Sequence, residues 1–343
     1  MIYNLLYGLA VPIVGVSMYG ISQGGMGSWV GFMVLFGLIP ILELSFPRWK
    51  RQDQNLPLSP WTNLWLYASP FYLSGLLIFS GVCFFQQTGW ERLGLVLTTG
   101  SLLGAFGITY AHELVHRAEA WERALGVWNL MLVNFAHWGI EHVFGHHRTV
   151  GTPEDGATAR KDQTLYHFWV QNYFQGLVHA WHFETTRLRN AKTPLFYHRI
   201  ALYWIFSALA TLVIGFAFGA LALLYWWSVA LVATVLLLTV DYIEHYGLTR
   251  VKKENGLYEP VKPQHSWDSA SWPTNAVLAN LGLHSHHHMK ARVPFHQLEP
   301  QKGAQTMPFG YSVMVVAALI PPLYFKIMNP RLEALQKQMM SAQ

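Results

Sequence analysis

Residues 200–240 read IALYWIFSALATLVIGFAFGALALLYWWSVALVATVLLLTV and contain no Asp, Glu, Lys or Arg. An α-helix needs about 20 apolar residues to span a hydrocarbon core of about 30 Å, so this stretch is long enough to cross a bilayer twice. Gly219 lies near its middle, where the chain would have to turn. The stretch therefore predicts a helical hairpin of two membrane spans, over residues 200–218 and 221–240.

Four more apolar segments precede this hairpin, over residues 2–20, 29–46, 64–85 and 93–111. The composition agrees with a membrane protein, because only 12% of the residues are charged, against about 25% in an ordinary soluble domain. A removed signal peptide is the alternative for residues 2–20, but no basic stretch precedes them and the next apolar segment follows within ten residues. We therefore predict an all-α integral membrane protein with six transmembrane helices.

The distribution of Lys and Arg predicts the orientation. If the N-terminus is cytoplasmic, the segments 47–63, 112–199 and 241–343 lie inside and carry 22 of the 23 basic residues, and only Arg92 lies outside. We expect a multi-pass protein of the inner (plasma) membrane, with both termini in the cytoplasm. One domain would cover residues 1–343, with a cytoplasmic helical cap made of residues 112–199 and 241–343.

Several local features refine this expectation. Residues 117–135 should continue the helix that ends the fourth span. Pro321-Pro322 interrupts the apolar residues 310–325, which favours a peripheral or re-entrant segment followed by a surface helix after Met328. The single Cys83 excludes a disulfide framework and a thiolate metal site within the chain. The basic residues, spread over the cytoplasmic face, suit anionic lipid or an acidic protein partner, so we expect no nucleic acid.

All seventeen histidines follow residue 111, and nine of them form four tight clusters that would all lie on the cytoplasmic side. The nine are His112, His116, His142, His146, His147, His245, His284, His287 and His288. Neutral imidazole is a common ligand of iron, zinc and copper, and two histidines four apart on a helix point from one face toward one ion. Because an ion takes four to six ligands, nine histidines indicate two ions in the cap.

Other interpretations of these residues are weaker. The sequence HELVH at 112–116 fits the HExxH motif of a zinc protease, but such an enzyme needs a single zinc with three ligands. Surface histidines would require four chance clusters at one membrane depth. We expect the remaining histidines to be hydrogen-bonded or exposed, and these are His137, His167, His179, His182, His198, His265, His286 and His296.

Six acidic residues lie near the clusters: Glu113, Glu141, Asp155, Asp241, Glu244 and Asp268. A ligating imidazole usually donates its second N–H to a carboxylate or carbonyl, so we expect these acids to support the histidines and not to bind the ions themselves. An all-nitrogen site against a membrane suits iron that activates O₂, more than redox-inert zinc.

The motifs resemble a known family. HELVH (112–116), EHVFGHH (141–147), TPEDGATAR (152–160), DYIEHYGL (241–248), HSWDS (265–269) and HSHHH (284–288) are similar to those of the alkane 1-monooxygenases, which are membrane di-iron hydroxylases related to xylene monooxygenase and the membrane fatty-acid desaturases. The similarity runs nearly end to end. Asp241, Asp268, Leu283 and His286 stand where the family usually has other residues.

The resemblance implies that the nine clustered histidines hold two non-haem irons and that the substrates are O₂ and a linear alkane. It implies that reduced rubredoxin, with its NADH-dependent reductase, supplies the electrons, and that six helices bound a hydrophobic channel to the metals. The product would be a 1-alkanol. The chain has no Cys pairs of its own, so the electron donor must be a separate protein, and Arg148, Arg160 and Lys161 are candidate docking residues.

Two alternatives remain at this stage. The same site could hydroxylate a methyl aromatic or a terpene, or could hydroxylate or desaturate a fatty acyl chain, because the shape of the channel decides the substrate. A metal transporter or metal sensor is the alternative from another class. It would need ionisable residues at mid-membrane, and the predicted spans contain almost none apart from Glu43.

Overall fold

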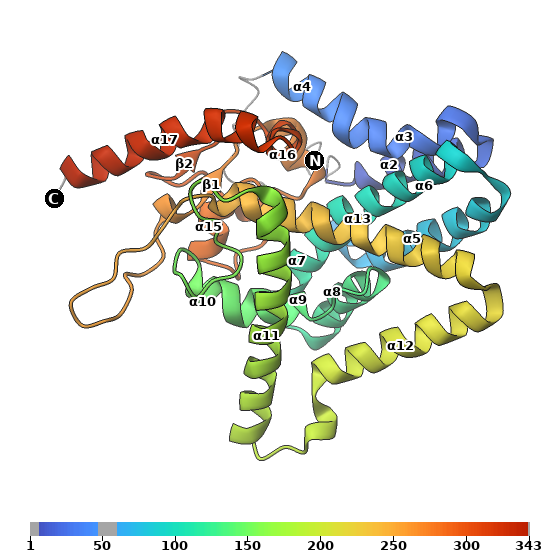
Figure 1. Cartoon of the computed structure of the whole chain (residues 1–343), viewed down its shortest axis with the longest axis horizontal. Helices are drawn as coiled ribbons and strands as arrows, with labels where there is room; N and C mark the ends of the chain where they lie inside the picture. Colours follow the sequence, from blue (N-terminus) through green and yellow to red (C-terminus); the bar gives the residue numbers. More distant parts are fainter. Residues whose placement is uncertain (1–6, 47–59, 342–343) are drawn as a thin grey trace.

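The structure, a computed structural model, describes residues 7–46 and 60–341 and consists almost entirely of helices. Long helices occupy one side of the molecule, and shorter elements with the C-terminal segment gather at the other (Figure 1). The elements up to residue 149 are α2 (Ala10–Gln23), η1 (Gly25–Trp29), α3 (Val30–Met33), η2 (Val34–Leu38), α4 (Ile39–Ser45), α5 (Pro60–Gln86), α6 (Gly89–Leu102), η3 (Leu103–Ile108), α7 (Thr109–Val115), α8 (Ala120–Leu132), α9 (Trp138–Glu141), η4 (His142–His146) and α10 (His147–Thr149).

The second part of the chain begins with three long helices, continues in short elements and ends in the long helix α17. In order these are α11 (Leu165–Asn190), η5 (Leu195–Tyr197), α12 (Arg199–Phe218), α13 (Ala220–His245), η6 (Pro263–His265), β1 (Trp267–Asp268), α14 (Trp272–Val277), α15 (His284–Met289), η7 (Phe295–Gln297), β2 (Gln305–Thr306), α16 (Tyr311–Ala318) and α17 (Pro321–Ser341). The two strands pair in parallel, with Trp267 opposite Gln305.

Five helical segments within the described residues are long and apolar enough to cross a membrane: Gly25–Ser45, Thr62–Gln86, Gly89–Val115, Arg199–Phe218 and Ala220–His245. These segments correspond to five of the six predicted spans. Their first and last residues lie within a few residues of the predicted ones. The first predicted span, residues 2–20, lies partly outside the described residues. Of its described part, residues 7–9 form a turn and residues 10–20 belong to α2.

The helix that carries the first histidine pair lies at the centre of the molecule. In the most apolar stretch of the segment Gly89–Val115, 89% of the residues are buried, against 6% of those in the most apolar stretch of α12. Glycines allow this close packing, because a Cβ at Gly100 would lie 2.5 Å from Val232 and one at Gly94 would lie 2.3 Å from the Trp29 ring. The exposed sides of α12 are apolar, as expected for a helix whose surroundings are lipid.

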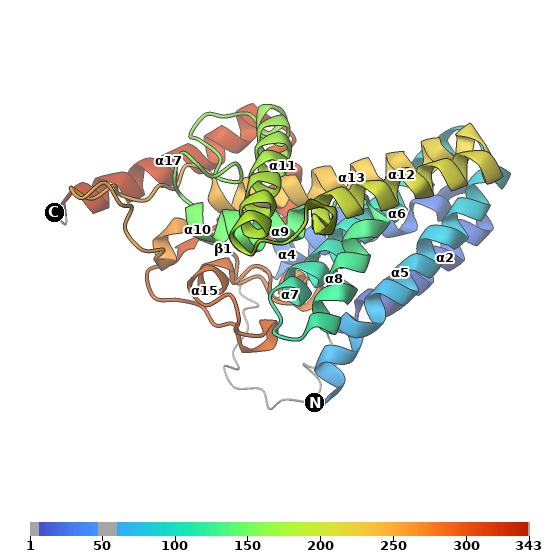
Figure 2. The ribbon, with the colours of Figure 1, turned by 90° about the horizontal axis from the view of Figure 1, so that it is seen from below.

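The predicted hairpin turn is present at Gly219. Its φ of 81° lies in the left-handed region, where a glycine pays no steric penalty, and it connects α12 directly to α13. The two helices contact each other near this turn, where Gly215 lies close to Leu223, and they diverge away from it (Figure 1), although they overlap in Figure 2. The pair of prolines also acts as predicted, because α16 ends at Ala318 and α17 begins at Pro321.

The continuous helix expected over residues 117–135 was wrong. α7 ends at Val115, and α8 begins at Ala120 and packs back against α7, with Gly126 close to Leu114. The break is stabilised because the Arg123 guanidinium donates hydrogen bonds to the carbonyls of Arg117 and Ala118, which would otherwise lack partners. The turn places α8 alongside the histidine helix.

A buried carboxylate joins α11 to α12. Glu184 accepts hydrogen bonds from Arg187 Nε at 2.8 Å, from Arg199 Nη2 at 2.7 Å and from the Arg199 backbone N–H at 3.1 Å. Burial alone would raise the pKa of the Glu184 carboxyl, but the two guanidinium groups outweigh it and hold the pKa well below its usual range. The ionised form of Glu184 therefore stabilises this corner.

Replacing Glu184 with Gln is expected to lower the free energy of unfolding by about 1–2 kcal/mol, since both arginines are partly exposed and screened. Because the folded-state pKa is lowered, the stabilisation is complete above the ordinary carboxyl pKa of about 4.3 and is lost as the pH falls below it. Thermal unfolding in detergent measures the change. The exposed Lys161–Glu333 pair supplies the control, because solvent screens this pair and Glu333→Gln should leave stability nearly unchanged. Equal effects of the two substitutions would contradict this role of Glu184.

Candidate metal centre

The structure brings the nine clustered histidines together from four segments. α7 and its end supply His112 and His116, the η4–α10 turn supplies three histidines, the end of α13 supplies His245, and α15 supplies three more. Seven of the nine are buried, and His116 and His147 are partly buried. Segments that are far apart in sequence thus converge on one small volume at the ends of the central helices.

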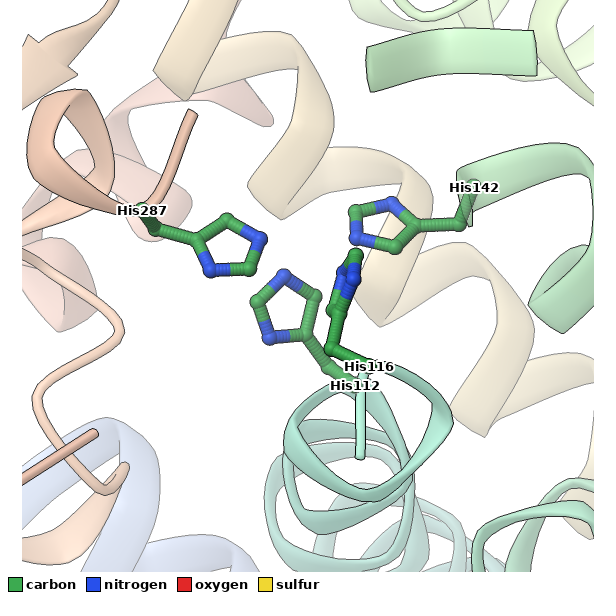
Figure 3. A group of neighbouring side chains, drawn as sticks. All are labelled: His112, His116, His142 and His287. Carbon is green, nitrogen blue, oxygen red and sulfur yellow. The ribbon is translucent and has the colours of Figure 1, made fainter. Parts of the chain in front are cut away.

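Eight of the nine rings form two groups of four. The first group contains His112, His116, His142 and His287, whose rings point toward one another in Figure 3. The second contains His146, His245, His284 and His288. Within each group, one nitrogen from every ring lies within 4.8 Å of the others, which is the spacing of ligands around a single ion.

His147 lies between the groups but contacts the first more closely. Its Nε2 lies 3.1 Å from His142 Nε2 and 3.0 Å from His287 Nε2. The expected sharing of one ion by histidines four apart describes His112/His116 and His284/His288. It fails for His142 and His146, which fall into different groups although their rings are 5.5 Å apart. Residues 142–146 form a π-helical turn, a geometry that is frequent at functional sites.

The ring nitrogens in these groups are arranged to donate their lone pairs to one shared cation. Nε2 of His112 and of His116 are buried and have no hydrogen-bond partner among the described residues. In the second group, His284 Nε2 lies 2.9 Å from His288 Nε2 and 3.1 Å from His245 Nε2, although it can share only one proton. A buried polar atom without a partner is costly, so a shared cation accounts for both observations.

Burial also favours the ligating form of these rings. It lowers the pKa of His142, His284, His287 and His288 well below the usual range, and that of His116 to about 3, since a charged imidazolium is poorly solvated there. Neutral imidazole is the form that binds a metal. For His146 burial acts in the same direction, but the Asp155 carboxylate outweighs it and raises the pKa to about 9.

Two of the six predicted acids contact the outer nitrogen of a clustered histidine. Asp155 accepts a hydrogen bond from His146 Nδ1 at 3.0 Å and is itself held by Thr158 Oγ1 at 2.6 Å. Glu244 lies 3.2 Å from His284 Nδ1 and accepts a hydrogen bond from the Tyr311 hydroxyl. Both contacts leave Nε2 of the ring directed into its group, which is the arrangement of ligating histidines in metal sites.

The other four acids support the site from further away. Asp268 accepts hydrogen bonds from the backbone N–H and hydroxyl of Ser285 and so fixes the start of α15. Asp241 accepts one from Asn172 at 2.8 Å, and Glu141 is buried against Gly145 and Gly176. Glu113 pairs with Arg117 at 2.7 Å and accepts from the Phe295 backbone N–H. None of these four has a hydrogen bond or ion pair with a clustered ring among the described residues.

Apolar space leads to the first group of histidines. A small cavity of about 10 Å³ lies between His112, His287, Leu278 and Phe295. A larger apolar cavity of about 50 Å³ adjoins it, shares Thr109, Leu278 and Leu281 with it, and extends between η2, η3, α13, α14 and α16. The two cavities together form an apolar approach from the spanning helices to the histidines.

Comparison with known proteins matches this arrangement. The model of the family described as fatty acid desaturase matches residues 88–315. Alkane 1-monooxygenase 1 of Pseudomonas aeruginosa is 39% identical over 88% of this chain and 82% of its own length. Alkane 1-monooxygenase 2 of the same organism is 35% identical over 89% and 84%. The chain belongs to the alkane 1-monooxygenase family. The family resemblance inferred from the histidine motifs is thereby confirmed, and the chain is an oxygen-dependent monooxygenase.

A more distant relative acts on a different kind of molecule by its name. The xylene/toluene monooxygenase hydroxylase component XylM of Pseudomonas putida is 27% identical over 96% of this chain and 89% of its own length. The alkane 1-monooxygenases are non-haem iron enzymes, and the two histidine groups of this chain could bind such a metal. The donors are all imidazole nitrogens, which suit iron, and their buried lone pairs are directed inward.

Several residues that hold the ligating segments of this alkane 1-monooxygenase family member could not be identified from the sequence. The His265 carbonyl contacts His245 Nδ1 at 3.3 Å, which is the role that an acid was expected to fill. Tyr311 and Asn172 hold Glu244 and Asp241, and Asn280 ties the turn before α15 to the Phe295 carbonyl. No motif marks Tyr311, Asn172 or Asn280, and the motif that contains His265 does not reveal the role of its carbonyl.

The remaining histidines lie outside the two groups. His198 caps α12 by accepting a hydrogen bond from the Ala201 N–H, and His286 accepts one from the Glu299 N–H. His137 is buried against Phe135 and Tyr173, and His265 lies 3.3 Å from Glu259. The other four are His167, His179 and His182 on α11 and His296 in η7.

Proposed function

We propose that this monooxygenase hydroxylates the terminal carbon of linear alkanes to give 1-alkanols. The observation that carries this is the apolar approach that ends at His112 and His287, in a member of the alkane 1-monooxygenase family. A saturated chain has no polar group to recognise, so it must be selected by shape and apolar contact. Leu278 and Leu281, which line both cavities, supply such apolar contact, and Glu113 is the one carboxylate that lines the smaller cavity.

The nine clustered histidines would hold two non-haem irons, one in each group, with His147 as the fifth ring at the first. Bound there, the irons supply the activation of O₂ that cleaves an unreactive C–H bond. The chain itself positions the metals through Asp155 and Glu244, and it excludes water because the site is buried beneath apolar walls. Asp268 fixes the helix that delivers three of the nine ligands.

The proposal includes the predicted topology: six spans, with the cap of residues 112–199 and 241–343 in the cytoplasm and the chain in the inner membrane as one domain. Five described spans and the strong bias of Lys and Arg support it. Electrons would come from rubredoxin and its NADH-dependent reductase. Arg148, Arg160 and Lys161 are exposed beside the loop that carries Asp155, so an acidic donor could dock within reach of the histidines.

The test is a whole-cell assay in which the chain is expressed with rubredoxin and its reductase and supplied with linear alkanes, toluene and a fatty acid. Mass spectrometry of the products is expected to show 1-alkanols that disappear in the His142→Ala variant. A benzylic alcohol or an unsaturated acid as the main product would contradict the alkane substrate while leaving the metal centre in place. If cells whose enzyme holds two irons per chain formed no product, that result would contradict the proposed activity with these donors.

Enlarging Leu278, which lines both cavities of the approach, is expected to shorten the alkanes that the enzyme accepts. In Leu278→Phe the ratio of long-chain to short-chain products should fall by about tenfold, because a few methylenes of lost space are worth 1–3 kcal/mol. Competition between alkanes of different length measures the ratio. Leu231→Phe, on the exposed side of α13, is the control and should leave it unchanged. If the product ratio were unaltered in a Leu278→Phe variant with normal iron content, the alkane would have to bind elsewhere.

A further inference from the structure

The exposed surface of α11 is divided lengthwise into two stripes of opposite character. One stripe is apolar, with exposed fractions of 37–59%, and consists of Tyr166, Val170, Phe174, Val178 and Trp181. The other is polar and consists of the exposed residues His167, Gln175 and His182 with the half-buried Gln171. Successive residues of a helix are turned by about 100°, so Phe174 and Gln175 face different directions from adjacent positions. Exposed apolar residues in such a row mark a contact surface.

The apolar stripe faces the membrane-spanning part of the molecule. Val170 and Phe174 line one wall of a groove of about 370 Å³, and Trp227 and Leu231 of α13 line the opposite wall. Leu231 is 63% exposed in the middle of a span, where the surroundings are acyl chains. The groove between α11 and α13 therefore opens toward the bilayer, and its apolar walls favour an acyl chain over water.

The direction of α11 differs from that of the spans. α11 runs across α12 and α13 in Figure 1, and in Figure 2 it is seen nearly end-on while those two helices lie lengthwise. At its far end Trp181 stacks on Trp204 of α12, with ring centroids 5.2 Å apart, so the stripe continues onto a lipid-facing helix. A helix that lies across the spans and joins their lipid surface lies in the plane of the membrane interface.

We propose that α11 lies in the interfacial layer of the membrane, with its apolar stripe against phospholipid, and that an acyl chain occupies the groove between α11 and α13. Two features besides the stripe fit a phospholipid. Leu195, Phe196 and Tyr197, which follow α11, are 54–69% exposed and extend the aromatic and apolar surface. Arg189 and Lys192 are exposed at the same end, where they can reach lipid phosphates.

The opposite face of α11 reaches the metal centre. Asn172 donates to Asp241 at 2.8 Å, Gly176 packs against Glu141, and Trp169 Nε1 donates to Thr239 Oγ1 at 3.0 Å. Glu141 precedes His142, and Asp241 lies one helical turn before His245. The same helix therefore touches lipid on one side and the supports of both histidine groups on the other, so lipid holds α11 in place over the metal centre.

Two single-cysteine variants test the proposal. The only native cysteine is removed by Cys83→Ala, and Phe174→Cys or Gln175→Cys is labelled with a fluorescent bimane in nanodiscs of phosphatidylcholine and phosphatidylglycerol. Lipids brominated in the acyl chain should quench the probe at 174 at least about threefold more than the probe at 175, and aqueous iodide should show the reverse order, since position 174 faces the acyl chains and position 175 is turned about 100° away from them.

Equal quenching at the two positions, or greater iodide quenching at 174, would overturn the proposal. A probe at 174 shielded from both quenchers would also overturn it, because a second copy of the chain would then cover the stripe. Normal iron content identifies variants that have folded. If Phe174→Cys does not fold, the adjacent pair Val170→Cys and Gln171→Cys makes the same comparison one turn earlier.

Discussion

Hydroxylation is expected to fall below detection when His287 is replaced with Ala, and bound iron is expected to fall from about two to about one per chain. His287 belongs to the first group, and its Nε2 also lies 3.0 Å from that of His147. Its loss removes one of the four nitrogens of the first group and also one of the two close contacts of His147. His288→Ala should have the same effect on the second group, although the two residues are adjacent in sequence.

The matched control is His179→Ala on α11, which removes an imidazole that lies outside both groups. Activity and iron content should remain at the wild-type level in this variant. Metal analysis of the purified proteins and product analysis with a linear alkane measure the two quantities. Normal activity in either His287→Ala or His288→Ala would contradict the assignment of the corresponding group.

Replacing Asp155 with Ala is expected to reduce activity or iron affinity by about 10–100-fold, which is the usual cost of losing the carboxylate partner of a ligating histidine. The carboxylate fixes the proton of His146 on Nδ1 and so directs Nε2 toward His245, His284 and His288. Asp155→Asn keeps an oxygen acceptor at the same place, and it should therefore recover part of the loss.

The adjacent Glu154 offers the control for Asp155. Its side chain is exposed, and Glu154→Gln should leave both activity and iron affinity unchanged. Chelator competition gives the iron affinity separately from turnover. If Asp155→Ala bound iron as tightly as the wild type and turned over normally, the hydrogen bond to His146 would have no part in positioning the metal.

The membrane spans could be predicted closely because they depend on one property of a continuous segment, its hydropathy over about 20 residues. The hairpin over residues 200–240 needed no knowledge of packing. The orientation of α11 could not be foreseen in the same way. Its sequence mixes His, Gln and Arg with aromatic residues, and only the position of Phe174 beside the groove next to α13 supports the proposal that this face meets the membrane.

The histidines could be selected from sequence because clusters at helical spacing are rare by chance, but their division could not. Whether His142 and His146 share an ion depends on where the other segments place their rings. His287 and His288, for example, lie more than 100 residues further along the chain. The roles of the acids were uncertain for a related reason. Glu141 adjoins His142 in sequence, but a turn of about 100° per residue directs it toward α11. Glu244 adjoins His245 and reaches His284 instead.

The most direct test of the central claim follows the oxygen atom. Purified enzyme in nanodiscs, loaded with iron and given reduced rubredoxin and a linear alkane under ¹⁸O₂, is analysed for labelled product. The account predicts a 1-alkanol that carries ¹⁸O, formed in the wild type and absent in His287→Ala. An alkanol whose oxygen comes from water, or the absence of any alkanol from a fully reduced enzyme with two irons, would contradict it.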